Sequence, residues 1–100
     1  MGESTIVPGS VANGMIDTAL GRFSTSADAR QVAVRPEHVS LGGALHGEVI
    51  DVVYQGSFKR VTARVNGVDL LARLPADATV SPGQRISLGI DAAHAIVLKD

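Results

Sequence analysis

Residues 47–74 read GEVIDVVYQGSFKRVTARVNGVDLLARL, which is the most regular stretch of the chain. Two turn sequences, Gln55-Gly56-Ser57 and Asn66-Gly67, divide it into three segments. Apolar residues alternate with polar ones along the second and third segments, at Val61, Ala63, Val65, Leu70, Ala72 and Leu74. Alternation with a period of two is typical of half-buried strands. The stretch is therefore predicted to form three consecutive strands, with Val49 to Tyr54, apolar on both faces, at the centre of the sheet.

Two further strands are predicted after this stretch. Ser81-Pro82-Gly83-Gln84 places Pro and Gly as a type II turn requires, and the apolar residues of Arg85 to Ile90 then alternate. Asp91 to His94 turns the chain before a last strand from Ala95 to Lys99. Counted from Gly47, five strands in a meander are about what a small, partly open barrel requires.

The N-terminal part is predicted to add a hairpin and a strand. A short strand in Glu3 to Ala12 is expected to be an edge or to end at Pro8-Gly9, because Pro lacks the N–H that a ladder needs. Asn13-Gly14 predicts a two-residue hairpin turn, and Met15 to Leu20 is the return strand, ended by Gly21. Arg22 to Arg30 is polar and is interpreted as an exposed connection.

The strand of Gln31 to Arg35 follows, and Pro36 to His38 is expected to form a turn or one helical turn. Gly42-Gly43 is interpreted as a flexible joint. The predicted fold class is thus all-β: a small OB-like barrel of about five strands with an additional N-terminal β-hairpin and strand. Residues 1–100 form one domain, in which 1–41 hold the hairpin, the strand and an Arg-Pro-Glu corner, and 42–100 the five-strand meander barrel.

Composition limits the possible functions. Apolar residues make up 45% of the chain but aromatic residues only 3%, so the core has little bulk and a partner, most simply a second copy, is expected to cover part of the apolar surface. A net charge of −1, without a basic track, argues against nucleic acid, as does the presence of only one Tyr and two Phe. There is no Cys, no apolar run near the roughly 20 residues of a membrane span, and no signal peptide after Met1. A soluble cytosolic β domain is expected.

One turn offers a candidate ligand site. Gly56 allows successive backbone N–H groups to point the same way, Ser57 adds a hydroxyl, and Lys59 and Arg60 follow with positive charge. Such a set can cradle an oxyanion. The alternative interpretation is a hairpin turn whose basic residues face water, and motifs this short have low specificity.

No catalytic or metal centre is predicted. His38, His46 and His94 lack the spacing of a metal motif, and they are interpreted as surface or turn residues. Nucleophile-elbow and phosphate-loop motifs do not occur. Arg35-Pro36-Glu37 has two interpretations, a salt-bridged corner at a strand exit or a contact point for a neighbouring domain or a second copy.

Four segments in order resemble one family. Val34-Arg35-Pro36-Glu37-His38-Val39 resembles the V-R-P-E-x-[IV] signature of the C-terminal regulatory region of ATP-binding-cassette importer ATPases. Residues 47–57 resemble its G-x-V-x-x-x-x-[YF]-x-G-S strand and turn, residues 82–88 its x-x-G-[DQ]-x-V-x-L strand, and His94 to Leu98 its last strand. In addition, the opening Met1 to Thr5 is similar to its [IL]-G-E-x-N, with Thr5 where Asn is usual.

The resemblance implies a TOBE-type barrel that serves importers of iron(III), spermidine/putrescine, sulfate or sugars. It implies a homodimer, an attached ATPase domain, membrane permease subunits and a cytoplasmic position peripheral to the inner membrane. Neither nucleic acid binding nor direct membrane insertion is expected. Walker A, signature and Walker B sequences are missing from these residues, so the chain is expected to be non-enzymatic and to need no cofactor. ATP and magnesium belong to the parent ATPase domain. The alternative function is a small-oxyanion sensor for sulfate, phosphate or molybdate.

Overall fold

The computed structural model describes residues 4–25 and 28–98. Within these residues the chain forms nine strands and two short 3₁₀ turns, η1 and η2. In chain order they are β1 (Thr5–Ala12), β2 (Met15–Thr18), β3 (Gly21–Ser24), β4 (Gln31–Val34), η1 (Pro36–His38), β5 (Val39–Tyr54), β6 (Phe58–Val65), β7 (Val68–Pro75), β8 (Arg85–Ile90), η2 (Ala92–His94) and β9 (Ile96–Leu98). None of the described residues forms a helix long and apolar enough to cross a membrane.

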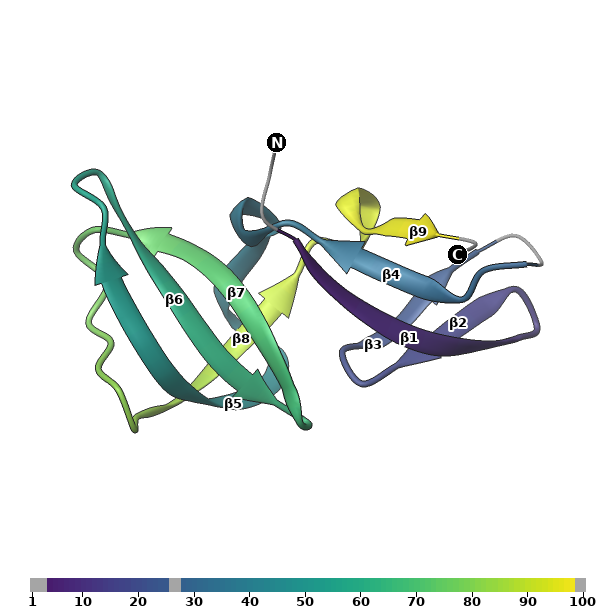
Figure 1. Cartoon of the computed structure of the whole chain (residues 1–100), viewed down its shortest axis with the longest axis horizontal. Coiled ribbons are helices and arrows are strands. Elements are labelled where there is room, and N and C mark those ends of the chain that lie inside the picture. Colours follow the sequence, from purple (N-terminus) through teal and green to yellow (C-terminus); the bar gives the residue numbers. More distant parts are fainter. Residues whose placement is uncertain (1–3, 26–27, 99–100) are drawn as a thin grey trace.

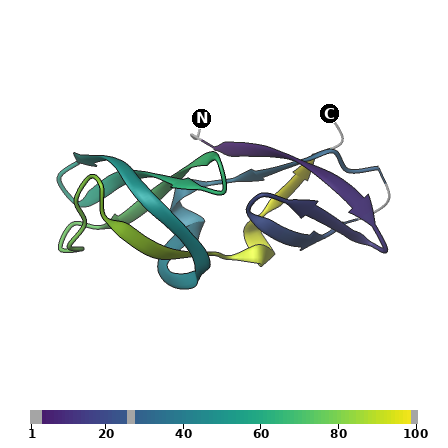
Figure 2. The same cartoon turned by 90° about the horizontal axis from the view of Figure 1, so that it is seen from below.

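The strands form two sheets that lie side by side along the long axis of the molecule (Figure 1). The N-terminal sheet has the strand order β3-β2-β1-β4-β9. The barrel sheet has the order β7-β6-β5-β8 and curls strongly, as the view from below also shows (Figure 2). The all-β fold class, an OB-like curled sheet with an additional N-terminal hairpin and strand, is confirmed.

The strand β5 curls the barrel sheet, because its two halves pair with different neighbours. Residues 39–41 and 45–48 pair with β8, and residues 48–49 and 51–54 pair with β6. The ladder with β8 shifts register between Leu41 and Leu45, where Gly42 takes a φ of 91°. Gly42-Gly43 is therefore a bulge inside one strand and not a flexible joint. A bulge of this kind bends a strand and increases its twist.

The turn chemistry read from the sequence is confirmed. Asn13 and Gly14 have φ of 55° and 76°, and Asn66 and Gly67 have φ of 51° and 81°. Positive φ at both central residues matches the type I′ hairpin turn. In the predicted turn from Ser81 to Gln84, Gln84 N–H donates to Ser81 O at 3.1 Å.

Three N-terminal predictions are wrong. The strand β1 neither ends at Pro8-Gly9 nor is an edge, because Thr5 to Pro8 pair with β4, Gly9 to Ala12 pair with β2, and β1 lies between these two strands. Pro8 thus lies where the strand changes partner, so its missing N–H does not interrupt a continuous ladder. Part of the predicted exposed connection is the strand β3, whose Phe23 is buried. The return strand is also shorter than expected, since it ends at Thr18.

The last strand does not join the barrel. Ala95 to Lys99 is predicted as the fifth strand of the meander, but β9 pairs with β4, so that Val97 lies opposite Val32. The barrel sheet keeps four strands, because β8 returns to pair with β5 and η2 then leads the chain away from it. Lys99, like residues 1–3 of the opening resemblance, lies outside the described residues.

One core extends through both sheets. Its most buried large side chains include Ile16 and Val32 in the N-terminal sheet and Leu70, Leu74 and Leu88 in the barrel sheet. Two polar contacts also join the sheets. Leu71 N–H donates to the buried Thr5 Oγ1 at 3.0 Å, and Asn66 Nδ2 donates to Ala19 O at 2.8 Å.

Candidate functional site

The Arg-Pro-Glu corner forms the 3₁₀ turn η1, which packs against β7. Arg35 is extended, with φ of −83° and ψ of 145°, as a residue before proline prefers. His38 N–H donates to Arg35 O at 3.0 Å and closes the turn. Burial of Pro36 fixes the corner against the barrel sheet, so its two charged neighbours have defined positions.

A pocket of about 390 Å³ lies between this corner and the barrel sheet. It is lined by Arg35, Pro36, Glu37, Gln55, Phe58, Arg60 and Arg73. Three arginines and one glutamate thus contribute to its lining, which gives the lining residues a positive formal balance. A second hollow of about 340 Å³ shares Glu37, Phe58 and Arg73 with it and adds Ser57. The residues that line these two hollows, which also include Leu74 and Pro75 in the second, are together named the basic groove.

Two of the arginines are direct cross-strand neighbours. Arg60 on β6 pairs with Arg73 on β7, so both side chains leave the same face of the sheet. The Arg73 guanidinium lies 4.0 Å from the centre of the Phe58 ring, a cation–π contact that orients it. Like charges directly opposite each other normally cost stability in a sheet. An anion bound between them would offset that cost.

The structure separates the four residues of the predicted oxyanion turn. Arg60 lines the basic groove beside the Arg-Pro-Glu corner, and Ser57 lines its second hollow. Gly56 takes a φ of 86° within the turn. Lys59 leaves the opposite face of β6, paired with the buried Leu74, and its Nζ donates to Ala78 O at 2.7 Å. Lys59 therefore fastens the connection after β7 and does not line the groove.

The corner residues lie where a partner can reach them. Arg35 and Glu37 both belong to the described part of the chain, and no ion pair is found between them there. Both line the basic groove. The groove thus combines residues of the two sites that were predicted separately from the sequence, with the exception of Gly56 and Lys59.

Arg73 and Phe58 were not predicted as site residues. A signal for Arg73 was present, because a two-residue turn at Asn66-Gly67 fixes the hairpin register and places Arg73 opposite Arg60. Phe58 carries no comparable signal, since an aromatic residue after a turn is equally compatible with the core.

A second cluster joins residues from distant parts of the sequence. The rings of His38 and His94 stack with their centres 4.3 Å apart and their planes 8° apart. His94 Nδ1 lies 2.8 Å from Asp91 Oδ2, and this hydrogen bond is the main cause that lowers the pKa of Asp91. The third histidine, His46, does not belong to this cluster. Its Nδ1 lies 3.2 Å from Ser87 Oγ.

The fold defines a class, that of small all-β modules with an OB-like curled sheet. Residues 32–98 match the TOBE domain, and the chain belongs to this family. The match runs from β4 to β9 and includes the whole basic groove. A search among curated proteins found no match. TOBE domains are regulatory or binding modules associated with ATP-binding-cassette transporters or with molybdate binding.

Proposed function

We propose that this chain is a regulatory and dimerisation domain of the ATP-binding subunit of an importer, without catalysis of its own. The observation that carries this proposal is the match of residues 32–98 to the TOBE domain, which includes the Arg-Pro-Glu corner. ATP and magnesium then belong to the attached ATPase domain, and the membrane permease subunits are partners of the assembled transporter. The domain works at the cytoplasmic face of the inner membrane, as a peripheral part of that complex.

The end of β5 offers the surface for a second copy. Ile50, Val53 and Tyr54 are 39%, 37% and 67% exposed, although all three are large apolar or aromatic residues. Within the described residues, the edge of β5 that faces away from β6 has no strand partner beyond Val49. An exposed strand edge with apolar side chains favours pairing with another strand. This surface, named the β5 tip, suits an antiparallel contact with its own copy.

Light scattering of the chain over a range of concentrations tests the dimer. The wild type is expected to dimerise at micromolar concentration, and Tyr54→Ser is expected to raise the dissociation constant at least tenfold. Ile6→Ser is the matched control, because Ile6 is also exposed (54%) but lies on β1 of the N-terminal sheet. A monomer at every concentration, or an equal effect of both substitutions, would contradict the role of the β5 tip.

The absence of catalysis is tested separately by an ATPase assay. The purified chain with ATP and magnesium is expected to release phosphate no faster than buffer alone. Turnover by the chain that scales with its concentration would overturn the proposal of a non-catalytic domain.

A second candidate function, an oxyanion sensor, is favoured by the three arginines of the basic groove. Arg35, Arg60 and Arg73 present planar donors, which bind the oxygens of sulfate, phosphate or molybdate in pairs. The Phe58 ring holds the Arg73 guanidinium in place, so less conformational entropy is lost on binding.

Calorimetric titration with the three anions tests this function. Arg73→Gln is expected to weaken anion binding at least tenfold. Arg64→Gln is the matched control, because Arg64 leaves the same face of β6 but forms a hydrogen-bonded ion pair with Asp69 at 3.0 Å. If the wild type shows neither heat nor a thermal shift up to millimolar anion, the sensor function is removed and the dimerisation proposal stands.

A further inference from the structure

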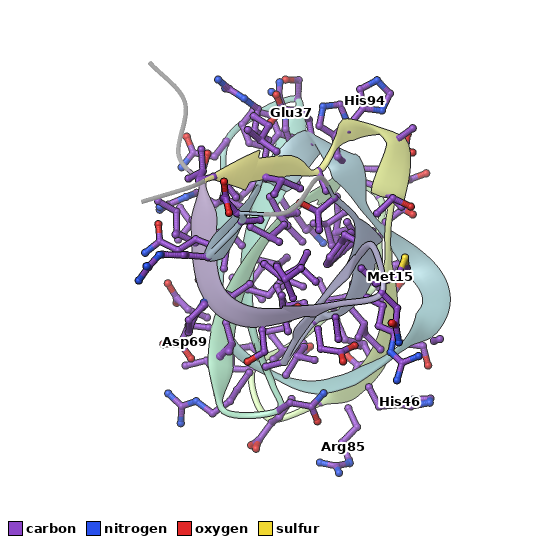
Figure 3. The ribbon with its side chains drawn as sticks, turned by 90° about the vertical axis from the view of Figure 1, so that its right-hand side faces the viewer. Met15, Glu37, His46, Asp69, Arg85 and His94 are labelled. Atoms are coloured by element: carbon purple, nitrogen blue, oxygen red, sulfur yellow. The ribbon has the colours of Figure 1, made fainter. Side chains whose placement is uncertain are left out.

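The two imidazoles of His38 and His94 meet at the junction of the two sheets. Asp91 N–H donates to His38 O at 2.9 Å and holds η2 against η1. One donor atom each from His38, Asp91 and His94 can be chosen so that all three lie within 4.8 Å of one another. His94 projects from the rim of the molecule in Figure 3, and both His94 and Asp91 are exposed while His38 is half-buried, so solutes can reach the cluster.

We propose that His38, Asp91 and His94 form a binding site for a divalent transition metal ion, with Zn²⁺ as its simplest occupant. Two imidazoles and one carboxylate are ligands that Zn²⁺ accepts, and three protein ligands leave a fourth position for water. With bonds of about 2.0–2.2 Å, tetrahedral ligand atoms lie roughly 3.3–3.5 Å apart. The widest separation in the present cluster therefore has to shorten by up to about 1.3–1.5 Å, which rotation of the exposed Asp91 and His94 side chains provides.

The hydrogen bonds of η2 alone do not account for the cluster. Asp91 Oδ1 accepts from Ala93 N–H at 3.2 Å and caps η2, while Oδ2 binds His94. These contacts explain why Asp91 and His94 lie together. They do not explain His38, which comes from η1, and whose ring makes no side-chain hydrogen bond recorded among the described residues.

The position of the cluster gives a bound metal ion a structural role. The turn η1 leads from β4 of the N-terminal sheet to β5 of the barrel sheet, and η2 leads from β8 back to β9. Both turns lie at the waist between the sheets (Figures 1 and 2). A metal ion held by His38 from η1 and by Asp91 and His94 at η2 would clamp together the two connections between the sheets, and would thus fix the orientation of one sheet relative to the other.

Titration of the chain with Zn²⁺, prepared without a histidine tag, tests the site. Calorimetry is expected to show one Zn²⁺ per chain, and His38→Gln, His94→Gln and Asp91→Asn are each expected to weaken binding at least tenfold. His46→Gln is the control, because His46 lies at the opposite rim, beside Arg85 in Figure 3. The Asp91→Asn change keeps an oxygen that can cap η2, so it tests the ligand and not the turn.

A measurement on the wild type makes the test independent of the folding of any variant. In NMR spectra, Zn²⁺ is expected to shift the imidazole signals of His38 and His94 and to leave those of His46 in place. The melting temperature is expected to rise with Zn²⁺ in the wild type and in His46→Gln, but not in His38→Gln. No heat up to millimolar Zn²⁺, or equal loss of binding in His46→Gln and His38→Gln, would overturn the proposal.

Discussion

Gly43 of β5 and Gly89 of β8 face each other so closely that a Cβ on Gly43 would overlap the Gly89 backbone. A Cβ on Gly89 has more room, since it would lie 3.2 Å from Gly43 Cα. This contact lies at the register shift between Leu41 and Leu45, where the barrel sheet bends.

Gly43→Ala is therefore expected to lower the free energy of unfolding by about 1–3 kcal/mol or more, because the backbone of β8 has to move. Gly89→Ala is expected to cost clearly less, since small adjustments relieve a contact of that length. Urea denaturation of the two variants measures the difference. Equal stability of Gly43→Ala and wild type would show that the bulge tolerates a side chain.

The two Asn-Gly turns provide a matched pair of substitutions. Asn13 and Asn66 have similar positive φ, but of these two side chains it is that of Asn66 which donates a hydrogen bond to a distant segment, at Ala19 O in the turn between β2 and β3. Asn66→Ala is expected to destabilise the chain by about 1 kcal/mol more than Asn13→Ala, the typical net contribution of one hydrogen bond. Thermal or urea unfolding of both variants checks this, and a larger loss for Asn13→Ala would contradict it.

Leu88 is the central side chain of the bend, since it lies opposite both Leu41 and Leu45 in the ladder with β5. It is fully buried, whereas Leu41 is 45% exposed. Leu88→Ala is expected to cost about 2–5 kcal/mol, and Leu41→Ala less than about 1 kcal/mol. The free energy of unfolding from urea titrations distinguishes them. Similar losses would mean that Leu41 becomes buried, for example in a dimer.

Lys59 is predicted to hold the connection between β7 and β8. Its hydrogen bond to Ala78 O is lost in Lys59→Met. The free energy of unfolding is therefore expected to fall by at most about 1.5–3 kcal/mol, the range for a hydrogen bond with a charged donor. Limited proteolysis should then cut residues 76–80 faster than in the wild type. Arg85→Met is the control for removing a basic residue, because Arg85 is exposed. An unchanged cleavage rate in Lys59→Met would contradict this role.

The local parts of the fold were predictable from the sequence. The hairpins at Asn13-Gly14 and Asn66-Gly67 depend on residues next to each other, and the alternation in β6 and β7 fixes which face is buried. The strand β9 was also predicted, but not its partner β4, because a period of two identifies a strand and says nothing about its neighbour. The strand β3 was missed, because Phe23 is the only apolar residue among its four residues and a single apolar residue shows no alternation.

The candidate sites were predictable only where their residues are close in sequence. Arg35 and Glu37 are separated by one residue, and the corner that they flank was identified from the sequence. The convergence of His38 with His94 was not, because motif spacing describes residues on one element and these two come from η1 and η2. Their contact results from the return of the chain to the N-terminal sheet, which the sequence pattern does not encode locally.

The place of β4 between β1 and β9 has a consequence for the order of folding. The strands β5, β6 and β7 are joined by short hairpins, so the barrel sheet closes small loops and is expected to form first. β4 precedes all of them in the chain, yet its outer neighbour β9 is synthesised after all of them. Until β9 arrives, the edge of β4 with its apolar Val32 is open to other chains. Aggregation during synthesis is therefore expected to begin at β4, in a protein whose native state covers that edge.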